Sequence, residues 1–196
     1  MMELVSQAWN ALSAKWILSG MVFFFIGYTI APWAYVKQIK ILIAYPLWIA
    51  GKMEQWLEKN WPTAAFMVTI FFFNTVSLSI DLFSGLVPFL PVLLIIWTGL
   101  NIGIIAYHTL KGRFYFTSLI NPVALLELPA AFITFSFALQ YNLHLVNFAQ
   151  APDLPFQRYV YFFAVLVLPL LFLAAILEAS IIRYTKPDSD NFEGRN

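Results

Sequence analysis

The feature that most constrains this chain is a repeated apolar stretch long enough to cross a lipid bilayer. A bilayer core about 30 Å thick needs roughly 20 apolar residues in a helix. The sequence has five such stretches in which charges are rare: 16–36, 62–83, 86–110, 119–140 and 159–183. They predict an all-α fold, namely a polytopic transmembrane helical bundle with about five spans.

The composition excludes two other classes of protein. Of 196 residues, 61% are hydrophobic and 11% are charged, whereas soluble domains are about 45–50% apolar and about 25% charged. A disordered chain would need few apolar residues and a high charge. A net charge of +1 without a basic block makes nucleic acid an unexpected partner, and zero cysteines exclude disulfides and thiolate metal sites.

A shorter apolar segment lies between the first two spans. The apolar run 41–51 is too short to cross, and Trp48 and Trp56 stand among charged residues nearby. Residues 41–60 therefore predict an interfacial amphipathic helix. We expect one transmembrane domain over 1–187 and a flexible polar tail at 188–196.

The distribution of basic residues predicts the orientation. Five spans put the termini on opposite sides, and the side of the N-terminus (side one) holds only Lys15 and Arg158. The other side (side two) holds nine basic residues: Lys37, Lys40, Lys52, Lys59, Lys111, Arg113, Arg183, Lys186 and Arg195. Because cytoplasmic loops are rich in lysine and arginine, we expect a multi-pass protein of the cell membrane with its C-terminus inside.

Catalytic motifs are missing from the sequence. There is no G-x-x-x-x-G-K-[ST], no H-E-x-x-H and no G-x-S-x-G, and the histidines are His108 and His144 alone. We therefore expect no enzyme, no catalytic residue, no cofactor and no metal. An intramembrane enzyme would require one of these histidines beside a serine or a carboxylate pair in a wet pocket.

Polar residues inside the spans are costly and each requires an explanation. At 1.5 Å per residue from side two, Glu127 would lie roughly 12 Å deep, Glu178 roughly 8 Å and Asn101 roughly 14 Å, with His108 and Arg183 near the same boundary. We predict that these five form one intramembrane polar cluster opening towards side two. The cluster could be a proton, ion or substrate site, or the glutamates could serve structure by bonding backbone groups that prolines leave open.

Other polar and small residues are expected to pack the bundle. Gly99 and Gly103 form a small-xxx-small pattern that favours close helix packing, and Asn74 is expected to join helices rather than to bind a ligand. Asp81, near side one, is expected to cap or bond the Ser84–Gly85 turn.

Three segments resemble the stage II sporulation protein M family of integral membrane proteins. Residues 71–108 (FFFNTVSLSIDLFSGLVPFLPVLLIIWTGLNIGIIAYH) are similar to its Asn-containing helix, Gly turn and Gly-x-x-x-Gly helix. Residues 121–139 (NPVALLELPAAFITFSFAL) resemble its "H-G-x-x-E-L-P-A" element, with Asn121-Pro122 where His-Gly is usual. Residues 168–187 (LPLLFLAAILEASIIRYTKP) resemble its closing helix.

The resemblance implies a multi-span helical protein that positions partners. The sporulation members belong to a membrane complex with peptidoglycan-degrading partners and are not themselves the hydrolases. The family's usual topology also implies an N-terminus inside, opposite to the orientation that the lysine count predicts.

Two functional hypotheses remain open from the sequence. The first is a non-enzymatic scaffold or complex subunit, whose partners are the lipid bilayer and other membrane proteins or a second copy of itself. The second is a small transporter, or the membrane subunit of one, that uses the Asn101–Glu127–Glu178 set.

Overall fold

The chain is a bundle of helices in the computed structural model, which describes residues 2–58, 62–113, 115–146 and 154–185. No strand occurs in these ranges, so the predicted all-α class is confirmed. The helices are α1 (Met2–Ala11), α2 (Ala14–Val36), α3 (Lys40–Glu58), α4 (Thr63–Ser84), α5 (Leu90–Thr109), the 3₁₀ helix η1 (Tyr115–Ile120), α6 (Ala124–Leu145), α7 (Phe156–Phe162), the π-helical turn η2 (Phe163–Val167) and α8 (Leu168–Thr185).

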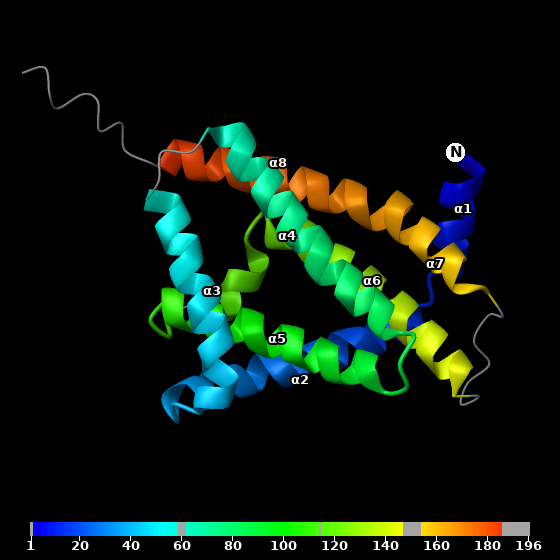
Figure 1. The fold of residues 1–196 in the computed structure, drawn as a ribbon, viewed down its shortest axis with the longest axis horizontal. Helices are drawn as coiled ribbons and strands as arrows, with labels where there is room; N and C mark the ends of the chain where they lie inside the picture. The colour runs from blue at the N-terminus through cyan, green and yellow to red at the C-terminus, as the bar shows by residue number, and fades with distance from the viewer. Residues whose placement is uncertain (1, 59–61, 114, 147–153, 186–196) are drawn as a thin grey trace, which may run out of the picture.

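Within the described ranges, five helical segments are long and apolar enough to cross a membrane. They are α2, α4, α5, α6 and the continuous helix α7–η2–α8, of which Phe156–Tyr184 is counted as one span. This confirms the polytopic bundle (Figure 1). The predicted polar tail at 188–196 and residues 59–60 of the predicted interfacial helix lie outside the described residues.

The fourth span begins later than the sequence pattern indicates. Residues 119–120 belong to η1, and α6 starts at Ala124 and runs to Leu145 instead of ending at Gln140. The side chain of Asn121 accepts the backbone N–H groups of Val123 and Ala124, both at 2.9 Å, and so fixes this helix start. The third span likewise begins at Leu90 instead of Leu86.

The closest helix contact joins α2 to α5, which lie side by side in Figure 1. A Cβ atom added to Gly27 would stand 1.9 Å from the carbonyl oxygen of Ile96, and one added to Gly99 would stand 2.1 Å from that of Phe24. One turn further along, Gly103 faces Ala31 and Tyr115. The two backbones therefore touch, and this approach is open only to glycine.

The other long helices pack around this pair. Helix α6 is the most buried of the five spans, and its Phe132 and Phe135 contact the ring of Phe24 on α2. Helices α4 and α8 pack against α6 and against each other, and α1 lies against α7 and η2 (Figure 1). The π-helical turn precedes Leu168 and Pro169, where the proline nitrogen has no proton to donate.

Helix α3 covers the predicted interfacial segment and has two apolar sides. Ile43 is buried with Ala31 and Ala34 of α2 and Leu100 and Ile104 of α5. The opposite side of α3 exposes large side chains at helical spacing: Ile41, Tyr45 and Trp48.

The turn between α4 and α5 is held by a residue of α6. The side-chain amide of Asn142 donates to the carbonyl oxygens of Gly85 (3.2 Å) and Val87 (2.7 Å), and its oxygen accepts the N–H of Phe89 (3.1 Å). Phe89 has a φ of +63°, which is uncommon for a residue other than glycine. Asn142 thus bonds three backbone groups of the turn between α4 and α5.

We predict that Gly27→Ala disrupts the α2–α5 contact. Because overpacking costs about 1–3 kcal/mol, the apparent melting temperature of the detergent-solubilised protein should fall by several degrees. Gly51→Ala is the matched control, since nothing lies within 4 Å of a Cβ added at Gly51 on α3. Equal melting temperatures for the two variants would contradict the close backbone approach.

We predict that Asn142→Leu lowers the stability of the folded protein by a comparable amount. It leaves backbone groups of the α4–α5 turn without partners, and each buried unsatisfied group costs about 1–3 kcal/mol. The measurement is unfolding in mixed micelles of increasing denaturing detergent. The control is Thr69→Ala. The Thr69 hydroxyl donates to the Ala65 carbonyl of its own helix (2.8 Å), so this variant should unfold at nearly the same detergent concentration as the parent protein.

Candidate functional site

The acidic residue of α6 stands at the start of its helix rather than deep within it. Glu127 lies in the first turn of α6, three residues after Ala124, which is about 4.5 Å along the helix axis. The sequence pattern predicts a depth of roughly 12 Å because it counts residues of η1 and of the Asn121 turn as part of the span. A carboxylate in the first turn is favoured by the helix dipole.

The partner of Glu127 comes from α4. The amide nitrogen of Asn74 donates to Glu127 Oε1 at 2.5 Å. Both side chains are half-buried, and the bond joins α4 to α6 in the interior of the bundle. The asparagine that contacts Glu127 is therefore Asn74 of α4, whereas the sequence predicts Asn101 of α5 for this place.

A second acidic residue faces this bond from α8. Glu178 lies near enough to Glu127 for the two carboxyl groups to interact electrostatically. Helices α4, α6 and α8 all contact one another. We call Asn74, Glu127 and Glu178 the acidic cluster, and it draws together one polar side chain from each of these three helices.

The remaining members of the predicted cluster lie elsewhere. His108 Nδ1 is hydrogen-bonded to the hydroxyl of Tyr35 on α2 at 2.9 Å. Arg183 is exposed, and no ion pair links it to Glu127 or Glu178 in the described part of the chain. Asn101 Oδ1 is enclosed, and the described residues offer it no hydrogen-bond partner. The contacts of the described residues therefore link none of these three to Glu127 or Glu178.

Asp81 also differs from its expected role. Its side chain does not bond the Ser84–Gly85 turn; instead, Thr98 on α5 donates to Asp81 Oδ2 at 3.5 Å. The bond within the turn runs from the hydroxyl of Ser84 to the backbone carbonyl of Asp81 (2.6 Å). Asp81 is buried and so ties α4 to α5 near side one.

Two tyrosines fix the segment that precedes α6. Tyr28 of α2 donates to the Tyr115 carbonyl at 2.8 Å, and the hydroxyl of Tyr115 donates in return to the Tyr28 carbonyl. Their rings stack with centroids 4.4 Å apart, and Ser118 lies 2.9 Å from the Tyr28 hydroxyl. Burial raises the pKa of the Tyr115 phenol above its ordinary value, which keeps it protonated as a donor.

Sequence reasoning missed Asn142 and the Tyr28–Tyr115 pair, which make several of these links. A fourth span that ends at Gln140 places Asn142 in a loop, whereas the structure has it in α6, and the sequence analysis does not single out Tyr28 or Tyr115. The available signal was Asn142 itself, a polar amide two residues beyond an apolar run. Three or more histidine, cysteine or acidic residues that could hold a metal are not grouped anywhere in the described ranges.

Taken together, five apolar helices with several of their polar groups bonded across helix contacts define an all-α integral membrane protein. The family model of stage II sporulation protein M matches residues 20–181. The chain belongs to this family, which confirms the resemblance found in the sequence.

Further comparisons give no closer relative. No curated protein matches the chain, and no solved structure does so either.

We predict that Asn74 and Glu127 stabilise the bundle as a pair. In a cycle of Asn74→Leu, Glu127→Leu and the double variant, the coupling free energy should be about 1 kcal/mol, as for hydrogen bonds between membrane helices. Unfolding in denaturing detergent measures each variant. Additive effects, with no coupling, would mean that the two side chains do not interact in the folded protein.

Proposed function

We propose that the chain is a non-catalytic scaffold or complex subunit that positions partner proteins in the cell membrane as a multi-pass protein. The observation that carries the proposal is how the interior polar groups are used. Glu127, Asp81 and Asn142 each bond a different helix or a turn between helices. Groups engaged in this way stabilise a fixed shape, which is what positioning a partner requires.

Helix α3 supports the same proposal as a contact surface. One side is packed against α2 and α5, so the helix is held in place. The other side exposes Ile41, Tyr45 and Trp48 at a spacing that forms one stripe. Aromatic residues on a fixed helix are typical of binding surfaces because they bury much area with little loss of conformational entropy.

The transporter alternative finds less support. It would need a water-filled route to the acidic cluster. Instead, Glu127 is already engaged inside the bundle, because it accepts a hydrogen bond from Asn74 of α4.

We predict that a photo-crosslinking amino acid at Trp48 captures one discrete partner, either another membrane protein or a second copy of the chain. The experiment uses the full chain in native membranes. Phe72 on α4 is the matched control position, because Trp48 is 58% and Phe72 59% exposed. Since α4 lies mostly exposed, with 17% of its apolar window buried, we expect Phe72 to label lipid alone.

Two results would argue against the scaffold. The first is the same pattern of adducts from both positions, which would mean that α3 faces lipid like α4. The second is a lone monomer after mild detergent extraction, with no adduct from any position along the Ile41–Trp48 stripe.

A further inference from the structure

The turn that follows α5 holds two basic side chains on a fixed backbone. Helix α5 ends at Thr109, and Lys111 and Gly112 both have positive φ values, +50° and +74°. Successive backbone bonds close the turn, among them Gly112 N–H to the Tyr107 carbonyl at 2.9 Å and Arg113 N–H to the Leu110 carbonyl at 3.0 Å. A Cβ at Gly112 would meet the Tyr107 ring at 3.0 Å, so the turn lies tightly against α5.

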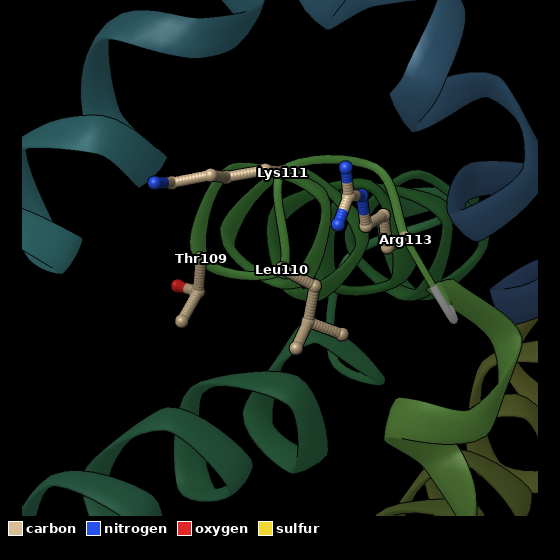
Figure 2. A pocket seen from close by; sticks show the side chains of 4 residues that line it. All are labelled: Thr109, Leu110, Lys111 and Arg113. Carbon is tan, nitrogen blue, oxygen red and sulfur yellow. The ribbon is translucent and has the colours of Figure 1, made fainter.

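A cavity of about 580 Å³ opens at this turn, lined by Thr109, Leu110, Lys111 and Arg113. This volume falls within the range of about 300–1,000 Å³ that small-ligand sites occupy. Figure 2 shows the Thr109 hydroxyl and the Lys111 ammonium group projecting to the same side of the end of α5, with the Arg113 guanidinium above the turn.

The chemistry of the lining selects an anion. Lys111 and Arg113 carry two positive charges, Thr109 adds a hydroxyl donor, and none of the lining residues that the structure describes carries a carboxylate. Both basic side chains are exposed and so open to a ligand. Guanidinium and ammonium groups with a hydroxyl donor suit the oxygens of a phosphate group.

The position of the cavity selects a lipid as the source of that phosphate. The cavity begins at the last residue of a membrane-spanning helix, which is the level of the headgroups. Leu110 is an exposed apolar residue in the same lining and can contact the glycerol and upper acyl chain. The cavity also lies on side two, which holds nine of the eleven basic residues and is expected to face the anionic cytoplasmic leaflet.

We propose that this cavity binds the phosphate headgroup of an anionic phospholipid. Lys111 and Arg113 pair with the phosphate, Thr109 donates a hydrogen bond to it, and Leu110 contacts the lipid. The site is separate from the acidic cluster and does not depend on the scaffold role.

The test uses the full-length protein in nanodiscs and in lipid-free detergent, with phosphatidylglycerol as the probe and phosphatidylcholine as the neutral lipid. Native mass spectrometry counts bound lipid, and a titration gives the affinity. The site variant is Lys111→Gln with Arg113→Gln. The matched control is Lys40→Gln with Lys52→Gln, which removes the same charge from α3 on side two but outside the lining.

We expect the parent protein to retain phosphatidylglycerol in preference to phosphatidylcholine. The site variant should bind phosphatidylglycerol at least about tenfold more weakly. Each of the two basic residues near the membrane surface is expected to contribute about fivefold to the affinity. The control should bind like the parent. A charge-conserving variant, Lys111→Arg with Arg113→Lys, should retain binding and show that loss in the site variant is not misfolding.

Three outcomes would overturn the proposal. Equal loss in the control variant would assign binding to diffuse surface charge. Absence of any preference between the two lipids would remove the site. Displacement of the lipid by millimolar inorganic phosphate would make a free phosphate the ligand instead.

Discussion

The structure depends on the backbone-to-backbone contact between α2 and α5. Lipid tails are as apolar as leucine side chains, so burial of apolar area gives little drive for helices to associate in a membrane. Gly27 and Gly99 remove side chains from both helices at the crossing, and the carbonyls of Ile96 and Phe24 fill the space. Dispersion contacts over this surface then supply the attraction that the solvent does not. Helix α3 and the aromatic residues of α6 pack onto the resulting pair.

Polar side chains supply the second level of organisation. Each link joins two different elements: Asn74 to Glu127, Thr98 to Asp81, and Asn142 to the Gly85–Phe89 turn. In a low-dielectric interior an unpaired polar group is costly, so such pairs exclude arrangements in which they separate. The glycine contact therefore gives affinity between two helices, whereas the polar links select one arrangement of all of them.

The sequence predicted the number and kind of helices because span length and the absence of charge are properties of a single segment. Predicting the site is harder because it requires the rotation of each helix about its own axis. Asn101 and His108 share α5 with Gly99 and Gly103, and the face that the glycines turn to α2 places His108 beside Tyr35. Glu127 was misplaced for a local reason, since the apolar residues 119–120 belong to a 3₁₀ segment rather than to α6. Glu127 and Glu178 could be paired from sequence because both lie near the same end of their spans.

The order of the helices along the chain has a consequence for biogenesis. Helix α2 emerges from the ribosome before α3 and α4, yet the backbone at its Gly27 packs against α5. Until α5 has been synthesised, that part of α2 lacks the helix against which it packs. Insertion of α2 into the bilayer and its docking onto α5 are therefore separate events, as in a two-stage scheme of membrane assembly. A nascent chain that ends before Leu90 would hold α2 in the bilayer without α5, the helix that packs against its Gly27.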